Sequence, residues 1–364
     1  MTFYPPTPSA ARAAGPGAAQ PLVEVADLRV RLVTARGPAD AVRGVSFTLG
    51  RGETLGLVGE SGCGKSLTAL ALLGLLPDGA QVSGSVRFDG QELVGLPDAA
   101  LCRLRGRRIG VVFQEPMTAL NPLARVGAQV AEPLRLHLRL GAAAARAQAV
   151  ALLDRVGLAD AKRRADAYPH QLSGGQRQRV TIAMALACGP DLLIADEPTT
   201  ALDVTIQRQI LDLIAGLVAE RGMALLLISH DLGVIAENAS RMLVMYGGMV
   251  AESGPTDALF ACRAHPYTQG LFAARPRLGA TATTGGTDGA ALSARPRLAT
   301  IGGTVPELAD LPPGCPFAGR CRLTADMCVT TPPAVEVGPA HLARCLRLDA
   351  ALATADDGGA AAAA

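Results

Sequence analysis

Residues 59–66 read Gly59-Glu60-Ser61-Gly62-Cys63-Gly64-Lys65-Ser66, directly after the apolar run 55–58 and directly before the helix-forming run 67–76. Glycines at these spacings let backbone N–H groups close around phosphate oxygens, and the N-terminus of the following helix adds positive partial charge. Lys65 is suited to neutralise β- and γ-phosphates, and Ser66 offers a hydroxyl to Mg²⁺. Lysine is otherwise found only at position 162, so a chance Gly-rich turn ending in Lys-Ser is a poor explanation. The octapeptide predicts a phosphate-binding loop between a buried strand and a helix.

A second apolar run, residues 192–195, ends in the two carboxylates Asp196 and Glu197. Burying charge costs several kcal/mol unless it is compensated, and Mg²⁺ is the natural compensation beside a phosphate loop. We therefore expect Asp196 to hold the metal and Glu197 to polarise the attacking water, because phosphoryl transfer needs an oriented nucleophile. A solvated Asp-Glu turn is the alternative. Together the two motifs predict a P-loop ATPase that binds ATP and Mg²⁺.

The apolar patterning predicts an α/β fold around these motifs. Residues 22–49 alternate apolar and polar side chains, and Asp89-Gly90 is a hairpin signal, so an N-terminal antiparallel sheet is expected. Runs without alternation at 55–58, 109–113, 192–195 and 224–228 indicate strands of a parallel sheet buried on both faces. Helical spacing replaces the strands between about 117 and 171, which predicts a helical insertion in the α/β core.

A second anion site follows the insertion. Ser173, Gly174, Gly175 and Gln176 precede the helical run 177–187, so a hydroxyl and two glycine amides are presented at a helix N-terminus. If the insertion holds this site away from the phosphate loop, it cannot serve the same nucleotide. It is expected instead to cap the ATP of a partner subunit.

The pentapeptide 172–176 resembles the signature of ABC (ATP-binding cassette) ATPases, and the motif order resembles theirs from about residue 22 to 271. The resemblance implies further roles. Gln114 would be the glutamine that contacts Mg²⁺ and the water, Asp203 would cross a dimer interface, and His230 would contact the γ-phosphate. The family often stacks adenine on an aromatic residue, and this chain has Leu32 at the best match, so the stacking contribution of roughly 1–3 kcal/mol is lost.

Three features resemble the ATPase subunits of dipeptide, oligopeptide and nickel importers. They are residues 113–122, the stretch 265–271 (His-Pro-Tyr-Thr-Gln-Gly-Leu) and a C-terminal cysteine module. The resemblance implies an ATP-hydrolysing subunit that powers import of peptides or a related small ligand. Its implied partners are a second ATPase subunit in a heterodimer or homodimer, two transmembrane permeases and, indirectly, an extracytoplasmic solute-binding protein. A soluble ABC ATPase acting on the ribosome or DNA, or a cluster-regulated ATPase, is the alternative.

Composition bounds the remaining possibilities. The net charge of +2 with 18% charged residues shows no basic excess for nucleic acid, and no apolar run approaches the roughly 18 residues needed to span a bilayer. We expect a peripheral protein at the cytoplasmic face of the membrane. The expected organisation is a disordered leader (1–21), an ATPase domain (22–278) with its insertion at about 117–171, a linker (279–304), a small cysteine-rich module (305–349) and a disordered tail (350–364).

The module carries Cys315, Cys321, Cys328 and Cys345 with spacing C-x5-C-x6-C-x16-C. A small Gly/Pro-rich module needs a cross-link or a bound metal for stability, and because cytosolic thiols stay reduced, a metal is favoured over disulfides. Zinc cysteines usually lie two to four residues apart, whereas four thiolates on looser loops can hold an iron–sulfur cluster. Zinc and unligated thiols remain alternatives, and the family resemblance favours a structural 4Fe-4S cluster. The other cysteines, taken as ordinary buried or loop residues, are Cys63, Cys102, Cys188 and Cys262.

Overall fold

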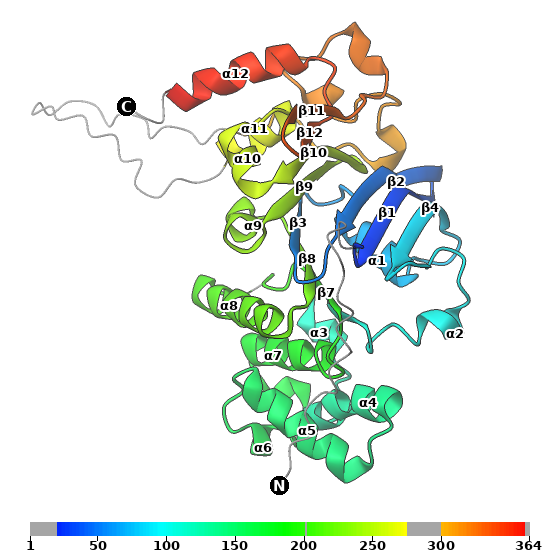
Figure 1. The fold of residues 1–364 in the computed structure, drawn as a ribbon, viewed down its shortest axis with the longest axis vertical. Coiled ribbons are helices and arrows are strands. Elements are labelled where there is room, and N and C mark those ends of the chain that lie inside the picture. The colour runs from blue at the N-terminus through cyan, green and yellow to red at the C-terminus, as the bar shows by residue number, and fades with distance from the viewer. Residues whose placement is uncertain (1–19, 201, 275–299, 361–364) are drawn as a thin grey trace, which may run out of the picture.

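The computed structural model describes residues 20–200, 202–274 and 300–360, and within them two sheets form the framework (Figure 1). A four-stranded antiparallel sheet has the order β2-β1-β4-β5, and an eight-stranded mixed sheet has the order β11-β12-β10-β9-β3-β8-β7-β6. The expected leader, except for residues 20 and 21, and residues 279–299 of the expected linker lie outside the described residues. No helix of the described chain has the length and apolar character that crossing a membrane requires.

The antiparallel sheet is where alternation predicted it. Its strands are β1 (Val23–Thr34), β2 (Gly37–Leu49), β4 (Gln81–Phe88) and β5 (Gln91–Glu92). The apolar positions face inward in register, as in the pairs Val25–Phe47 and Val30–Val42. Asp89 and Gly90 have φ of 53° and 79°, which is the positive pair that a two-residue type I′ hairpin turn requires.

The mixed sheet contains all four predicted parallel strands. They are β3 (Thr54–Val58), β6 (Ile109–Val112), β7 (Leu192–Asp196) and β8 (Ala224–Ser229), and β9 (Arg241–Tyr246) continues the parallel order beside β3. Helices α1 (Lys65–Leu73), α2 (Asp98–Leu101), α8 (Val204–Arg221) and α9 (Leu232–Asn238) accompany these strands. Parallel strands bring their carboxyl ends to one edge, so the loops after β3, β6, β7 and β8 meet there.

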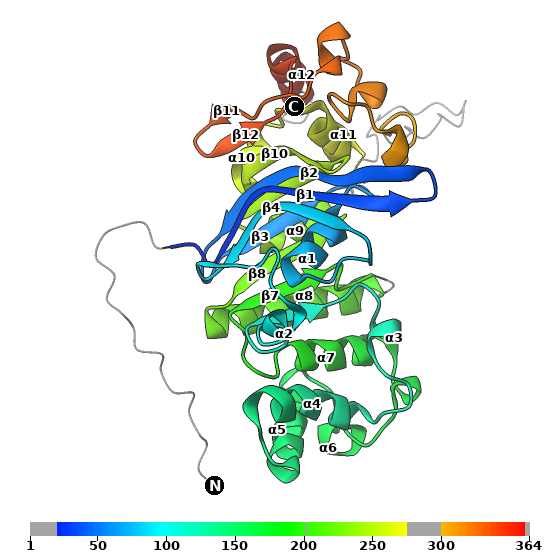
Figure 2. The same ribbon diagram turned by 90° about the vertical axis from the view of Figure 1, so that its right-hand side faces the viewer.

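The helical insertion also agrees with the prediction. It comprises α3 (Pro116–Ala119), α4 (Val126–Leu138), α5 (Ala142–Arg155), α6 (Ala161–Arg164) and the 3-10 turn η1 (Pro169–Gln171), and α7 (Gly174–Ala185) leads back to the sheet. In both views α4, α5 and α6 lie at one end of the molecule, opposite the C-terminal segment (Figures 1 and 2).

The C-terminal segment does not form a module separate from the ATPase core. Strands β12 (His341–Ala343) and β11 (Val335–Gly338) extend the mixed sheet by pairing with β10 (Met249–Pro255), where Glu252 lies opposite Ala343. The remaining elements of this region are α10 (Thr256–Ala261), α11 (Pro266–Ala273), η2 (Leu308–Asp310), η3 (Ala318–Arg320) and η4 (Asp326–Val329).

The expectation of a disordered tail over residues 350–364 was wrong for the part that is described. Helix α12 (Leu348–Ala360) occupies it. Alanine has the highest helix propensity, and the helix is anchored by the buried Ala351, whose carbonyl accepts a hydrogen bond from Gln269 Nε2 at 2.8 Å. Residues 361–364 lie outside the described residues.

Candidate functional site

The predicted phosphate loop joins β3 to α1, and its lysine is folded into the loop. Lys65 is only 6% exposed, and its Nζ donates to the carbonyls of Gly59 at 2.8 Å and Glu60 at 3.1 Å. Gly59 must be glycine, because a Cβ there would stand 2.2 Å from the carbonyl oxygen of Met245. The loop is therefore packed closely against β9, and the Lys65 ammonium lies inside the loop.

Asp196 ends β7 beside this loop, with the environment expected of a metal ligand. Burial raises the pKa of Asp196, although a hydrogen bond from Ser66 opposes the shift, and the neighbouring charge of Glu197 adds to it. Its Oδ1 is buried and makes no hydrogen bond. An unsatisfied carboxylate oxygen next to a serine hydroxyl is the donor set that Mg²⁺ binds, so Ser66 and Asp196 fit this ion.

Three polar side chains surround the carboxylate of Glu197. Its Oε2 accepts hydrogen bonds from Gln114 Nε2 at 3.1 Å and Thr200 Oγ1 at 3.0 Å, and it lies 3.3 Å from His230 Nδ1. Gln114, Glu197 and His230 follow β6, β7 and β8, so the shared sheet edge brings together the three residues predicted to be catalytic. Sequence reasoning missed Thr200, for which the only signal was a hydroxyl one helical turn after the glutamate.

The backbone of Glu197 is itself unusual. Its φ is 45°, in the left-handed region that costs a residue other than glycine roughly 1–2 kcal/mol. Its N–H donates to the carbonyl of Ile228 on β8 at 2.9 Å, which helps to hold this conformation. Strained backbone of this kind is typical of functional sites, where the surrounding structure fixes it.

A cavity opens beside these groups. It holds about 680 Å³ of empty space, and Ser66, Gln114 and Asp196 line it together with apolar residues of α1 and β6. The described residues thus place the last residue of the phosphate loop, the candidate metal-binding carboxylate and Gln114, which donates to Glu197, around one open space. Phosphoryl transfer to water requires that combination.

The second predicted anion site lies elsewhere. Ser173 caps α7: its Oγ accepts from Gln176 N at 3.4 Å and its N–H donates to Gln176 Oε1 at 3.1 Å. Gly174 and Ser173 are exposed, and Figure 1 shows α7 beside the helical insertion, away from α1. Gly175 approaches α8 so closely that a Cβ would stand 2.8 Å from Ile206 Cγ2. The described residues therefore do not bring this motif to the phosphate loop.

Two further predicted residues have ordinary structural surroundings. Asp203 is exposed and caps α8, its Oδ1 accepting from Ile206 N at 3.0 Å. Leu32 is half-buried and packs against the core of the antiparallel sheet. Their contacts with a partner subunit and with adenine, respectively, stay predictions.

Comparison with known proteins gives this arrangement a family. A family model described as ABC transporter matches residues 42–200, and one described as oligopeptide/dipeptide transporter, C-terminal region, matches residues 251–328. A putative peptide import ATP-binding protein of Brucella melitensis is 48% identical over 337 residues, which is 90% of this chain and 97% of that protein. The chain belongs to the ABC transporter family.

Other members resemble this ABC chain in part. The oligopeptide transport ATP-binding protein OppD of Mycobacterium tuberculosis is 51% identical over 90% of this chain, which spans only 52% of that relative. Among solved structures, a dimeric ATP-binding cassette in a post-hydrolysis state with ADP and phosphate is 30% identical, with a TM-score of 0.58, over 64% of this chain and 98% of its own. CbiO1 of Clostridium perfringens is 28% identical with a TM-score of 0.56, over 66% and 91%.

The stretch 265–271 of this ABC chain has a direct link to the phosphate loop. His265 caps α11, since its Nδ1 accepts from Tyr267 N at 3.0 Å, and Pro266 begins the helix. Tyr267 is fully buried, and its hydroxyl accepts a hydrogen bond from the backbone N–H of Glu60 at 2.8 Å. The sequence offers no sign of this contact, because nothing in it links a tyrosine to a partner 207 residues away.

The four cysteines of the C-terminal region are gathered but do not form a ready metal site. All four are free thiols; burial, with smaller contributions from the nearby thiols of Cys328, Cys321 and Cys345, raises the pKa of Cys315 to about 11. Within the described part of the chain, no three His, Cys, Asp or Glu side chains are arranged to hold a metal ion. The predicted iron–sulfur cluster is therefore not supported by this arrangement.

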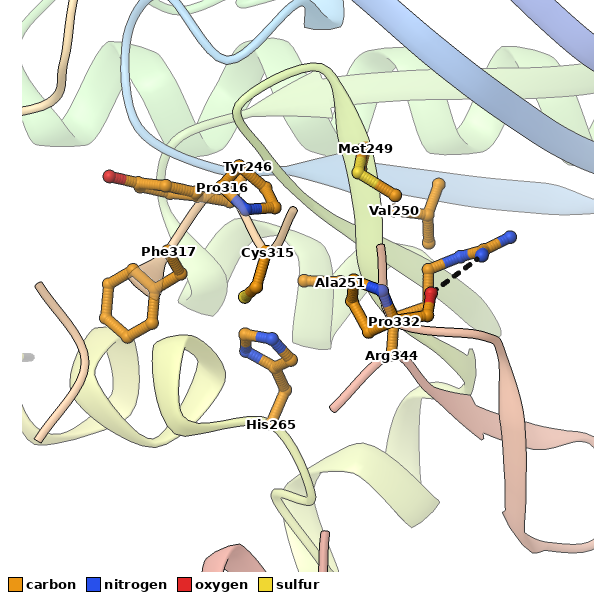
Figure 3. Close-up of a pocket in the computed structure, with 10 residues that line it drawn as sticks. All are labelled: Tyr246, Met249, Val250, Ala251, His265, Cys315, Pro316, Phe317, Pro332 and Arg344. Carbon is orange, nitrogen blue, oxygen red and sulfur yellow. Dashed lines mark hydrogen bonds between the residues drawn. The ribbon is translucent and has the colours of Figure 1, made fainter. Parts of the chain in front are cut away.

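Cys315 instead lines a small apolar pocket with about 230 Å³ of empty space between β9, β10 and the cysteine-bearing loops. Figure 3 shows its thiol pointing toward the ring of His265, with the ring of Phe317 beside them, 6.0 Å from that of His265. The buried His265 has a pKa lowered to about 4 by the loss of hydration. These neighbours favour a neutral, uncharged environment around the Cys315 thiol.

Proposed function

We propose that this chain is the ATP-hydrolysing subunit that powers import of di- or oligopeptides, or a related small ligand, through an ABC transporter. The observation that carries the proposal is the meeting of Gln114, Glu197 and His230 beside the phosphate loop and the open Asp196 carboxylate. The names of the relatives support peptide import as the transport activity, and the C-terminal family match supports the same subgroup.

Each group of residues at the site has a separate proposed role. The loop 59–66 and Lys65 bind the phosphates, and the lysine exchanges the carbonyls of Gly59 and Glu60 for phosphate oxygens. Mg²⁺, when bound by Ser66 and Asp196, offsets the charge that develops on the transferred phosphoryl group. Glu197 orients the attacking water and accepts its proton at the carboxylate, while Gln114 and His230 hold that carboxylate in place.

A second cassette completes the proposed site. Ser173 and Gly174 are exposed at the N-terminus of a 12-residue helix, and this anion site lies away from the chain's own phosphate loop. A solved relative is dimeric with ADP and phosphate bound, which agrees with a nucleotide between two cassettes. The further proposed partners are two transmembrane permeases and, indirectly, a solute-binding protein, with the chain on the cytoplasmic face of the membrane.

The test combines Glu197→Gln with reconstitution. In the complex of both cassettes and permeases, Glu197→Gln should bind ATP normally and hydrolyse it at least about 10²-fold more slowly, the usual effect of losing a general base. Lys65→Ala should weaken ATP binding instead. Near-normal hydrolysis by Glu197→Gln would contradict the assignment, and co-purification with ribosomes or DNA rather than polytopic membrane proteins would favour the alternative class of soluble ABC ATPases.

For the C-terminal cysteines we propose a bound 4Fe-4S cluster with a structural role. What supports the proposal is that Cys321, Cys328 and Cys345 lie close enough to Cys315 to raise the pKa of its thiol, and binding would require the four thiols to turn toward a common centre. Protein purified anaerobically should then be brown and lose its colour in Cys321→Ser. Colourless protein with one zinc per chain would reject the cluster but keep a metal staple, and metal-free protein with a protease-resistant C-terminal region would reject both.

A further inference from the structure

The phosphate loop is held from outside by the C-terminal segment. Arg320, at the end of η3, lies 260 residues from Glu60 in the sequence, yet its Nη1 donates to Glu60 Oε2 at 2.6 Å and its Nη2 to Oε1 at 3.1 Å. The Arg320 side chain is only 6% exposed, and that of Glu60 27%. A two-pronged guanidinium–carboxylate pair fixes direction as well as distance, so it restricts how Glu60 can move.

Arg320 is itself tightly placed. Its Nε donates to the carbonyl of Gly302 at 2.8 Å, Nη1 also lies 3.3 Å from the hydroxyl of Tyr246, and the guanidinium stands 5.7 Å from the centre of the Tyr246 ring. The hydrogen bond to Glu60 is the main cause that raises the pKa of Arg320. The pair is therefore built into the packing between the C-terminal segment and the end of β9.

The backbone of Glu60 is also held by hydrogen bonds. Its N–H donates to the hydroxyl of the buried Tyr267, whose ring packs 4.6 Å from that of Tyr246. Its carbonyl points the other way and accepts from Lys65 Nζ at 3.1 Å. A continuous set of contacts thus runs from Arg320 through Glu60 to the lysine that binds phosphate.

We propose that Arg320 is a positioning residue for the phosphate loop, acting through the Glu60 carboxylate so that the C-terminal segment sets the nucleotide affinity of the cassette. The proposal rests on the proposed function, because the loop must bind ATP for its position to matter. Glu60 contributes its side chain to the C-terminal contact and its backbone to the loop. This division explains an acidic residue inside a loop that receives phosphates, where its charge would otherwise repel the ligand.

The experiment is a double-mutant cycle on the full-length chain, read out as the equilibrium dissociation constant for Mg-ATP. Arg320→Gln and Glu60→Gln should each weaken binding, on the order of tenfold, the lower range for loss of a supporting partner around a ligand site. The double variant should be no weaker than either single variant, because both remove the same interaction. Arg322→Gln is the matched control: this exposed arginine bonds Gln269 at 2.9 Å, and its loss should leave the affinity unchanged.

Arg320→Lys keeps the charge but not the two-pronged contact, and it should bind ATP with an affinity between those of the wild type and Arg320→Gln. If Arg320→Gln fails to fold, the same cycle is run with Arg320→Lys. Wild-type affinity in the Arg320 variants, or losses in the two single variants that multiply in the double variant, would overturn the proposal alone. A wild-type chain that binds no ATP, or binds it equally well as Lys65→Ala, would overturn the proposed function and this inference with it.

Discussion

Asp196 and Glu197 are adjacent carboxylates with opposite surroundings. Glu197 Oε2 has three polar neighbours, whereas Asp196 Oδ1 has none and is buried at the end of β7. The polar neighbours fix the orientation of the Glu197 carboxylate, and the Asp196 oxygen without a hydrogen-bond partner is suited to a cation. Asp196, the proposed metal ligand, is therefore expected to lower the stability of the chain in the absence of Mg-ATP, as is common where function requires an unsatisfied group.

Asp196→Asn should raise the melting temperature of the nucleotide-free chain while abolishing its stabilisation by Mg-ATP. Burial raises the folded-state pKa of Asp196, so between its ordinary pKa of 3.8 and the raised value the folded chain keeps a proton that the unfolded chain has lost. Stability supplied by the protonated form is thus lost as pH rises through this window. If Asp196→Asn removes about 1 kcal/mol of the cost of burying the charged carboxylate, the melting temperature should rise by roughly 2–4 °C for a domain of this size.

Differential scanning calorimetry over a range of pH, with and without Mg-ATP, measures both effects. The fall in melting temperature with rising pH should be smaller in Asp196→Asn than in the wild type. A variant that melts lower than the wild type at neutral pH and still gains stability from Mg-ATP would contradict this account of Asp196.

Most residues of the candidate site could be picked out from the sequence because each follows a recognisable buried strand or lies in a motif. Lys65, Asp196 and Glu197 are cases in which residue type and position alone led to the predicted chemistry. Thr200 and Arg320 could not be found this way, since their roles come from contacts that only the folded chain makes. A polar residue in a loop or a 3-10 turn has no periodic signal that indicates its partner.

At the scale of elements, the loop between β3 and α1 depends on close backbone approach more than on side-chain contacts. A Cβ on Gly59 would meet the Met245 carbonyl at 2.2 Å and Cys63 Sγ at 2.7 Å. A Cβ on Gly62 would meet nothing within 4 Å, although its φ of 81° is unfavourable for alanine. Gly59, whose φ is 157°, would thus meet steric overlap in addition to backbone strain, whereas Gly62 would meet backbone strain alone.

Gly59→Ala should destabilise the chain by about 3 kcal/mol or more, because backbone atoms of β9 cannot move aside cheaply. Gly62→Ala should cost only about 1–2 kcal/mol, the strain of a left-handed residue with a side chain. Chemical denaturation of the two variants beside the wild type measures both values. Equal costs would show that β9 yields to the added methyl group and that close approach does not shape the loop.

Element prediction succeeded where local pattern and tertiary role coincide. Strands β3, β6, β7 and β8 are short runs buried on both faces, and the structure has them at those residues. Strands β11 and β12 are only four and three residues long, and they exist because β10 offers an edge to pair with. Helix α12 was missed because glycines and small residues suggested disorder, whereas its alanines favour a helix once Ala351 is buried.

At the scale of the whole molecule, the C-terminal segment completes the ATPase core. His341 Nε2 lies 2.7 Å from the buried carboxylate of Glu252, and Phe317 packs 5.1 Å from the ring of Tyr246 and 5.3 Å from that of Tyr267. A boundary at residue 304 based on composition therefore does not coincide with a boundary in packing.

A chain shortened to residues 1–299 should melt well below the full chain and aggregate, because it exposes the edge of β10 and the aromatic residues under Phe317. A chain shortened to residues 1–347 loses only α12 and is the control, with a smaller loss expected. Thermal melting followed by light scattering distinguishes the two. A fragment 1–299 as stable as the full chain would show that the segment is an independent module after all.

The proposed pairing with a second cassette rests on the separation of the two anion sites. Ser173 is exposed on α7 while Lys65 is buried beside β3, so one chain presents a phosphate loop and a distant helix N-terminus that suit two nucleotides rather than one. Two chains arranged head to tail would bring each signature to the other's loop, and ATP would be enclosed on both sides.

The purified chain should therefore hydrolyse ATP slowly when dilute, and its rate per chain should rise with its own concentration or with added partner cassette until association is complete. Ser173→Arg should abolish this rise, because a bulky cation at the interface blocks approach of the second chain's nucleotide, yet leave Mg-ATP binding to the isolated chain intact. Steady-state hydrolysis measured across a dilution series, beside equilibrium binding of ATP, tests both statements. A high rate per chain that does not change with dilution would mean that one chain assembles the whole site, and the exposed signature would then need a different partner.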